Sequence, residues 1–474
     1  MTPKILQGTY LMRWLKFFSC YPPPKLTLSL TEQRKIWLVN FLKAFAVVTI
    51  VYMTMYLIRN NLKASSGLLK DQLGFSTIQL GQIGLAFSIA YGIGKTLLGY
   101  LVDGHNTKRI ISGLLVLASL CVVSIGIVLA THHQAMGFLL TMWGLNGLFQ
   151  SVGGPASYAT IMQWTPKLQH GRWLGAWNTS HNIGGAVAGI LALWGANTLF
   201  AGHVYGMFIF PAIIALAIGC ITLFIGSNSP EELGMERVEI LFDEPLNKDN
   251  IEATKLSKWT IFRTYVLGNK WVWLLCIANV FVYLIRIGID NWAPLYTKEM
   301  FSFDTKQQVN TIFYFEIGAL IASLLWGYIS DLAGGRRALV ALFCLLLTLP
   351  AILGYRYGNS AWQINFSLFC LGVLIFGPQL LIGVSVVGFV PRQAIAVTNG
   401  TTGTFGYIFG DSIAKIGLAM IADTKLTGLI IFGHTLHGWN DTFKVFYLAL
   451  ILGIILLGFV AYGEEKKSKD EFFL

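Results

Sequence analysis

The sequence predicts an all-α integral membrane protein with twelve transmembrane helices in two pseudo-symmetric six-helix halves. Two observations support this prediction. Of the 474 residues, 55% are hydrophobic and only 12% are charged, which is typical of a membrane protein. Short motifs of the first half also recur about 227 residues later, on the other side of one long polar segment, which indicates a parallel duplication.

Apolar runs separated by polar breaks define the spans in order. The twelve spans are expected to start near residues 37, 78, 107, 136, 171, 204, 269, 307, 337, 361, 393 and 439. This pattern divides the chain into a leader, a first half, a linker, a second half and a tail, with the bounds 1–36, 37–227, 228–268, 269–463 and 464–474.

Lysine and arginine residues gather in alternate loops, in the linker and at both ends of the chain. Because positively charged loops stay on the cytoplasmic side, we expect both termini in the cytoplasm and the protein in the inner cell membrane. The leader lacks an early apolar core with a small-residue cleavage site, so we expect it to be retained. The net charge of +11 then reflects topology, and no nucleic acid partner is predicted.

Two arginines are the most unusual residues of the spans. Arg59 and Arg286 each follow fifteen residues without a charge, and each ends the sequence Tyr-Leu-Ile-Arg. A guanidinium at this depth costs roughly 3 kcal/mol on insertion scales, so it usually lines a polar cavity and meets a partner there. The alternative is that both side chains extend to the far headgroups, because fifteen residues cover about 22 Å of a core about 30 Å thick. Their repetition favours the cavity, where two such groups can hold one phosphate from two sides.

A charged motif follows the second span of each half. It is Gly-Tyr-x-x-Asp with two basic residues further on, and it includes Asp103 and Arg109 in the first half and Asp331 and Arg337 in the second. This loop resembles the signature of the major facilitator superfamily, which implies the major facilitator fold. We interpret the four residues as gating residues whose charges pair across helix ends. The alternative is that these charges only set the topology.

A second motif occupies residues 170–185, which are HGRWLGAWNTSHNIGG. The run resembles the signature of the organophosphate:phosphate antiporters, except that His170 replaces the first arginine. The resemblance implies that His181 lies at the phosphate site. An imidazole there can donate to phosphate and titrate near neutrality. The alternative is a histidine whose hydrogen bonds are satisfied within a helix interface.

Residues 277–294, 310–319, 376–383 and 410–415 are similar to the hexose-phosphate branch of that family. The resemblance implies import of hexose phosphate, such as glucose 6-phosphate, in exchange for inorganic phosphate. It also implies a substrate site formed by Arg59, Arg286, His181, Lys95, Tyr52, Tyr56, Tyr283, Tyr407 and Asn178. The alternative for the tyrosines is that they only pack between helices or lie in interfacial belts.

One pair of positions departs from part of this branch. Some hexose-phosphate transporters carry an aspartate and a lysine three residues apart in the eleventh span, where this chain has Asn399 and Thr402. We expect these two residues to contact the sugar. In this respect the chain resembles a membrane sensor that detects external glucose 6-phosphate and activates a histidine kinase. A non-transporting receptor with a kinase partner is therefore the alternative to transport.

The remaining charges within the spans have simpler explanations. Asp411 and Lys415 are four residues apart and could neutralise each other, and Asp290 could partly compensate Arg286 in the same way. Glu316 has no partner nearby in the sequence, so we expect it in the cavity or in a cross-helix ion pair. No catalytic triad or metal-binding cluster stands out, so we predict neither an enzyme nor a cofactor.

Overall fold

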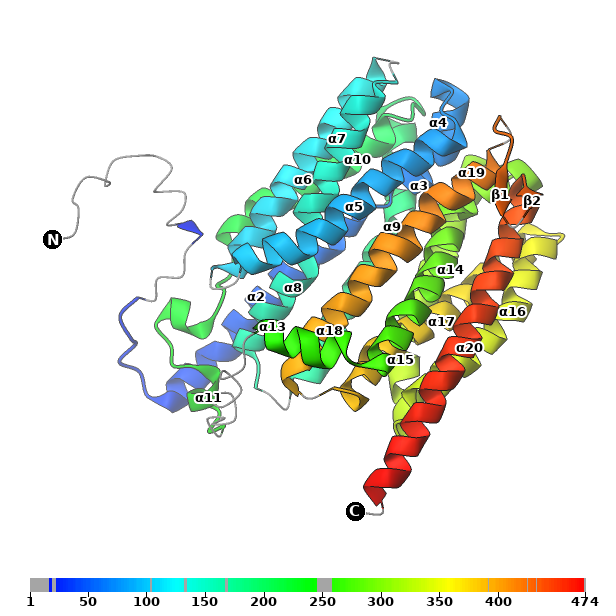
Figure 1. The fold of residues 1–474 in the computed structure, drawn as a ribbon. Coiled ribbons are helices and arrows are strands. Elements are labelled where there is room, and N and C mark those ends of the chain that lie inside the picture. Colours follow the sequence, from blue (N-terminus) through cyan, green and yellow to red (C-terminus); the bar gives the residue numbers. More distant parts are fainter. Residues whose placement is uncertain are drawn as a thin grey trace.

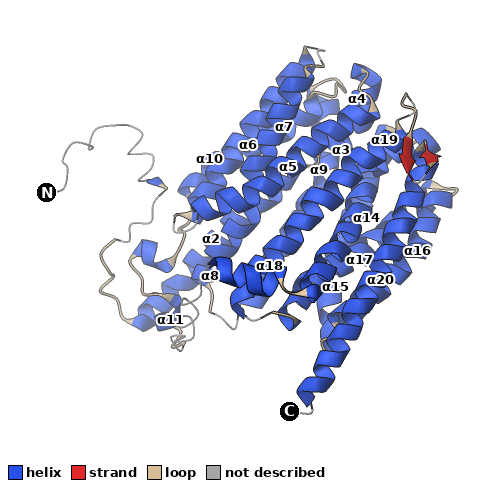
Figure 2. Ribbon diagram, viewed as in Figure 1, coloured by secondary structure: helices blue, strands red, loops and turns tan. Residues whose placement is uncertain are grey.

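The protein forms a bundle of long helices that run side by side in a computed structural model of the chain (Figure 1). The structure describes residues 17–18, 23–102, 105–131, 134–166, 169–244, 258–390, 392–423, 425–431 and 433–472. Within these residues nearly all regular structure is helical, and one short β-hairpin lies at one end of the bundle (Figure 2). We call this the hairpin end. The opposite end, where α2 begins and α20 ends, is the termini end.

The first half of the bundle contains helices α2 to α10. Their bounds are α2 Leu30–Leu57, α3 Asn61–Ala64, α4 Ser66–Leu73, α5 Thr77–Val102, α6 Thr107–Ala130, α7 Met136–Gln150, α8 Gly153–Trp164, α9 His170–Leu199 and α10 Gly206–Phe224. The first span begins before the predicted residue 37. Ser29 and Glu32 form a capping box there, in which each side chain accepts a hydrogen bond from the other residue's backbone N–H. The end of the predicted leader is therefore the first part of α2.

The predicted linker is partly folded. It contains η3 Pro230–Leu233, α11 Val238–Leu241, α13 Lys258–Ile261 and η5 Phe262–Leu267. Leu241 packs with Trp37 and Trp164 in a small separate core, and Arg34 pairs with Asp243 at 2.8 Å. The first part of the linker is thus attached to the first half of the bundle.

The second half contains the helices from α14 onward. Their bounds are α14 Lys270–Phe301, α15 Thr305–Leu332, α16 Arg337–Tyr357, α17 Ala361–Ser385, η6 Val386–Gly388, α18 Arg392–Phe405, η7 Gly406–Asp411, η8 Ile413–Gly417, α19 Leu418–Ala422 and α20 Trp439–Phe472. The hairpin between α19 and α20 pairs β1 Leu429–Ile431 antiparallel with β2 His434–Leu436. α20 continues into the predicted tail, whose glutamates and lysines favour a helix.

The twelve predicted spans are present in the predicted order. Ten helices of the described chain are long and apolar enough to cross a membrane, and α5 and the consecutive helices α7 and α8 supply the other two spans. Apart from α2, each span begins within two residues of its predicted start. Two spans are irregular: the fourth is broken between α7 and α8, and the eleventh contains the π-helical turns η7 and η8. Such turns are frequent at functional sites.

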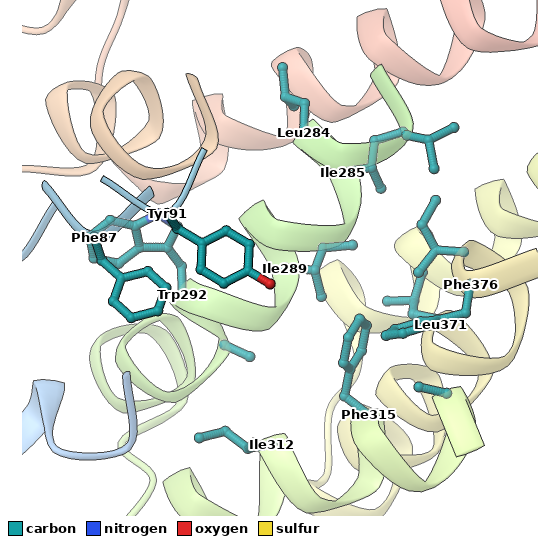
Figure 3. Close-up of a cluster of buried hydrophobic side chains, with 14 of the residues drawn as sticks. Phe87, Tyr91, Leu284, Ile285, Ile289, Trp292, Ile312, Phe315, Leu371 and Phe376 are labelled. Carbon is teal, nitrogen blue, oxygen red and sulfur yellow. The ribbon is translucent and has the colours of Figure 1, made fainter. Parts of the chain in front are cut away.

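A buried apolar core runs through both halves. Figure 3 shows part of it, with Phe87 and Tyr91 from α5 and Phe315 from α15. Small residues let the helices approach closely, as packing between membrane helices requires. A side chain at Gly372 of α17, for example, would clash with the backbone oxygen of Phe315. At this point the backbones of α15 and α17 are in direct contact.

Charged contacts join the two halves at the hairpin end. The ion pairs that cross between the halves there are Lys63 with Asp290, Lys70 with Glu299, and Asp71 with Lys298. The carboxylate of Asp423 also accepts a hydrogen bond of 3.0 Å from the backbone N–H of Ile78, in the first turn of α5. These contacts close the hairpin end of the interface between the halves.

Candidate binding site between the two halves

A polar cavity lies between the halves, and both arginines line it. The first half contributes residues of α2, α3, α5, α7 and the turn between α2 and α3, and the second half residues of α14, α15 and span eleven. The charged lining residues are Arg59, Lys63, Arg286, Asp290, Glu316, Asp411 and Lys415. The alternative in which the two arginines extend into the headgroups is therefore wrong. Four cations and three carboxylates leave the cavity with a net positive charge, which favours an anionic ligand.

Arg59 lies in the turn that separates α2 from α3. Its Nε donates a hydrogen bond of 3.0 Å to Oε1 of the buried Gln150. Its guanidinium carbon lies 4.2 Å from the ring centre of Tyr56 and 4.8 Å from that of Tyr91. Within the described chain Nη2 is buried without a hydrogen-bond partner. One hydrogen bond and several rings thus orient the group and leave donor capacity for an anion.

Arg286 lies in the middle of the continuous helix α14. Its guanidinium carbon is 4.0 Å from the ring centre of Phe376 and 5.9 Å from that of Tyr283, and its buried Nε has no hydrogen-bond partner among the residues that the structure describes. A buried unpaired donor costs about 1–3 kcal/mol, and more when it is charged. Both arginines therefore gain from a ligand that supplies hydrogen-bond acceptors.

Aromatic rings connect the surroundings of the two arginines. Tyr407 lines the cavity, and its ring centre lies 5.1 Å from that of Tyr91 and 5.2 Å from that of Tyr283. The ammonium of Lys95 lies 5.6 Å from the ring centre of Tyr407. Tyr91 is a member of this wall that the sequence analysis does not identify. Its signal is the spacing of four residues from Lys95, which places both on one face of α5.

The predicted His181 lies behind Tyr56. Its ring centre is 5.3 Å from that of Tyr56 and 6.2 Å from that of Tyr52, which stacks on Trp177 at 4.6 Å. Nδ1 of His181 is buried without a hydrogen-bond partner, and Asn178 lies one turn earlier on α9. This group adjoins the cavity wall without being part of the lining. Its contribution to binding stays a prediction.

Lys63 is a cavity residue that the sequence analysis misses. Its ammonium bonds both carboxylate oxygens of Asp290, at 2.5 Å and 2.6 Å, and lies 3.8 Å from Oε1 of Glu316. The interpretation that Asp290 compensates Arg286 is therefore wrong, because a cation of the other half binds that carboxylate. The expectation for Glu316 is confirmed, since it lines the cavity and belongs to a cross-helix ion pair. The available signal for Lys63 is its offset of 227 from Asp290, which equals the offset between the arginines.

The predicted pairing of Asp411 with Lys415 is confirmed at 3.0 Å. Ser88 of α5 joins this pair: its hydroxyl donates to Oδ2 of Asp411 at 2.9 Å and accepts from Nζ of Lys415 at 2.6 Å. Because Ser88 belongs to the first half, the three residues connect the two halves at the wall of the cavity.

The two predicted sugar contacts, Asn399 and Thr402, lie on α18, outside the lining of the cavity. Asn399 is exposed, whereas Thr402 is buried and its hydroxyl donates to the carbonyl of Thr398 at 2.6 Å. The structure does not bring these two residues to the arginines, and their contact with a sugar stays a prediction.

The structure does not describe all four of the predicted gating residues. Asp103 lies outside the described residues, and Asp331 belongs to the last turn of α15. Arg337 donates a long hydrogen bond of 3.4 Å to the carbonyl of Val384, and its Nε is buried without a partner. A gating role for these residues stays a prediction.

Arg109 contacts the linker. It pairs with Glu232 at 3.0 Å and donates to the backbone carbonyl of Phe17 at 2.9 Å. These bonds attach the start of α6 to the linker and to the leader. The gating role predicted for Arg109 therefore requires a change of partner between states.

Comparisons with protein families and solved structures agree with this architecture. The family profile described as Major Facilitator Superfamily matches residues 48–414. Among solved structures, a bacterial homolog of the human lysosomal transporter Spinster, in an inward-facing and unoccupied conformation, superposes with a TM-score of 0.70 at 14% identity. That alignment covers 91% of this chain and 97% of the other, and it shows the fold alone.

Curated relatives are similar over almost their whole length. The hexose-6-phosphate:phosphate antiporter of Escherichia coli is 46% identical over 459 residues, which are 96% of this chain and 98% of the relative. The antiporter of the same name from Salmonella typhimurium is 45% identical over the same shares. A glycerol-3-phosphate transporter of Haemophilus influenzae is 31% identical over 90% of this chain and 92% of its own.

Proposed function

The chain belongs to the Major Facilitator Superfamily, and we propose that it is an antiporter that imports hexose phosphate in exchange for inorganic phosphate. It is a multi-pass membrane protein and a transporter, not an enzyme. Alternating access moves the substrate: the two halves rock about a site at their interface, so the cavity opens to one side at a time. Glucose 6-phosphate is the representative substrate.

One observation carries this proposal. Arg59 and Arg286, from equivalent positions of the two halves, line one cavity, and each keeps a buried donor atom that finds no partner among the described residues. A phosphoryl group offers several acceptor oxygens and negative charge, and guanidinium groups bind it bidentately. Inorganic phosphate and a phosphate monoester share this group. A single site can therefore hold either, which exchange requires.

The same arginines explain why exchange is favoured over one-way release. An empty cavity that closes around two uncompensated guanidiniums retains their desolvation penalty, whereas a bound dianion offsets it. The loaded protein can therefore change state more easily than the empty one. Phosphate from inside must bind before the cavity returns to the outside.

We further propose an inner-membrane location with both termini in the cytoplasm. α2 begins and α20 ends at the same end of the bundle, and the described parts of the linker, which contain Arg237, Lys258 and Arg263, lie there too (Figure 1). Positively charged segments are retained on the cytoplasmic side. A reporter that is active only in the cytoplasm should work when fused to either terminus and fail when inserted in the hairpin.

Reconstitution into proteoliposomes tests the function. Labelled glucose 6-phosphate should accumulate in vesicles loaded with phosphate and not in vesicles loaded with buffer alone. Labelled phosphate should leave the vesicles in the same experiment. Saturable binding without uptake in loaded vesicles would support the sensor alternative, in which the protein acts through a kinase partner.

A further inference from the structure

A second polar group in the cavity differs in chemistry from the arginines. It consists of Ser88, Asp411 and Lys415, and we call it the ion-pair cluster. Ser88 is 1% exposed and Asp411 3% exposed, and the three side chains are linked by the hydrogen bonds of 2.6 Å and 2.9 Å described above. Asp411 and Lys415 line the same cavity as Arg59 and Arg286. The sequence suggests only mutual neutralisation for this pair.

The surface of α5 is shaped to receive the lysine. A Cβ on Gly84 would lie 3.2 Å from Cδ of Lys415, and a Cβ on Gly81 would lie 2.6 Å from its backbone oxygen. Side chains at these glycines would push the π-helical segment away. The lysine stem therefore lies directly against α5, and its ammonium reaches Ser88 one turn further along that helix.

The ion-pair cluster lies close to the arginine site. The ring of Phe87 contacts cations of both groups: its centre is 5.3 Å from the guanidinium carbon of Arg59 and 5.8 Å from Nζ of Lys415. These two distances limit the separation of the cations to about 11 Å. A single small ligand can thus contact both.

The hydrogen-bonding capacity of the cluster does not suit a second phosphoryl group. Asp411 and Lys415 neutralise each other, so an anion gains little from them. Oδ1 of Asp411 is in ion-pair contact with the ammonium at 3.0 Å but accepts no aligned hydrogen bond from the described residues, and the ammonium has a third donor besides those directed at Ser88 and Asp411. A spare acceptor beside a spare donor matches a hydroxyl group, which both donates and accepts.

We propose that the ion-pair cluster binds hydroxyl groups of the substrate, so that the cavity has a phosphoryl end at the arginines and a hydroxyl end at Asp411 and Lys415. This inference rests on the proposed function and deepens it. The substrates are then phosphate monoesters whose remaining part carries hydroxyl groups within reach of the cluster. Inorganic phosphate binds at the arginines and does not use the cluster.

The test measures two KM values in phosphate-loaded proteoliposomes, one for external glucose 6-phosphate and one for external phosphate. In Asp411→Asn the ratio of these values should rise about tenfold, because a charge-assisted hydrogen bond to a hydroxyl is lost. The double variant Asp411→Asn/Lys415→Gln should show the same rise without leaving a buried lysine unpaired. A hexose phosphate that lacks the hydroxyl bound by the cluster should have a higher KM than glucose 6-phosphate in the wild type. In the Asp411 variants the two substrates should have equal KM values.

Asp423→Asn is the matched control. Asp423 lies on the same span and also contacts the first half, through Ile78, but it does not line the cavity. In Asp423→Asn the ratio of KM for glucose 6-phosphate to KM for phosphate should stay within about twofold of the wild-type ratio. An unchanged ratio in both Asp411 variants, or an equal rise in Asp423→Asn, would overturn the hydroxyl assignment. Absence of phosphate-dependent uptake by the wild type would instead remove the antiport function itself.

Discussion

Arg59 and Arg286 occupy equivalent positions in the two halves, but the structure holds them differently. Arg59 lies in a break between two helices, and the side-chain amides of Asn60 and Asn61 after it bond to backbone oxygens of α9 and α10, at 3.3 Å and 3.1 Å. Arg286 is followed by Ile287 and Gly288 in an unbroken helix. Arg59 bonds the side chain of Gln150, whereas the contacts of Arg286 within the described chain are with the rings of Tyr283 and Phe376. The duplication kept both guanidiniums at the cavity while the backbones that carry them diverged.

A second equivalent pair shows where symmetry must fail. Lys63 and Asp290 also differ by 227 residues, and here the two equivalent side chains bond each other. Residues that touch their own symmetry mate lie at the pseudo-twofold axis. Two like charges would repel there, so the positions carry opposite charges. The arginines, four residues earlier in each half, can stay alike because an anion fits between them.

The largest expected effect comes from removing the feature that the arginines share. Arg59→Lys and Arg286→Lys keep the charge but lose the two parallel donors, so each should lower phosphate exchange about 100-fold or more. The measurement is the initial rate of labelled phosphate exchange in proteoliposomes, corrected for the amount of folded protein. Wild-type rates in either variant would contradict bidentate phosphate binding.

The second largest effect should come from a change that alters the surroundings of Arg286 and not those of Arg59. In Lys63→Met the freed carboxylate of Asp290, four residues after Arg286, can turn to that arginine and neutralise it. We expect KM for phosphate to rise about tenfold, which is about 1.4 kcal/mol. The double variant Lys63→Met/Asp290→Asn removes both charges and should return KM to within about twofold of the wild type. Equal KM values in the single and double variants would argue against this competition.

A smaller effect should fall on Arg59 alone. Gln150→Leu removes the hydrogen bond that orients this arginine, so KM should rise about fivefold, as expected for one hydrogen bond of about 1 kcal/mol. Gln379→Leu is the matched control, because Gln379 bonds the hydroxyl of Tyr283 at 3.3 Å rather than an arginine. An equal rise in both variants would mean that the orientation of Arg59 is not the cause.

The smallest effect should come from the more exposed ion pairs of the hairpin end. There Lys70 and Asp71 pair with Glu299 and Lys298 of the second half. The Lys70 and Glu299 side chains are 27% and 25% exposed, so their pair is worth little. Lys70→Glu should change the exchange rate about twofold at low salt and less at high salt. The swap Lys70→Glu/Glu299→Lys should restore the rate, and failure to do so would show that the pair does not hold this end closed.

Much of the site could be predicted because its signals are local. The two arginines stand out against long uncharged runs, and Asp411 with Lys415 is a one-turn spacing within one helix. Gln150 and Ser88 could not be found in this way. Each lies within a helix of ordinary composition, and it matters only through a residue of another segment: Arg59 and Lys415, respectively.

Asp290 shows how a local rule can fail. Its spacing of four residues from Arg286 predicts a contact within one helix, which is worth only about 0.2–0.5 kcal/mol on a helix surface. The structure supplies a stronger partner, Lys63, from the other half and in a buried place. A short-range preference of that size is easily overridden by tertiary packing.

The sequence by itself determined the twelve spans, their order, the duplication and the presence of two buried arginines, because the lipid environment selects long apolar helices and makes each charge conspicuous. The tertiary structure alone decided that Asp290 does not neutralise Arg286. Lys63 of the other half binds Asp290, so within the described chain both guanidiniums keep an open donor in one cavity. The physical reason is that ion pairing depends on distance in space. Lys63 and Asp290 lie 227 positions apart in the chain, but their side chains meet in the fold.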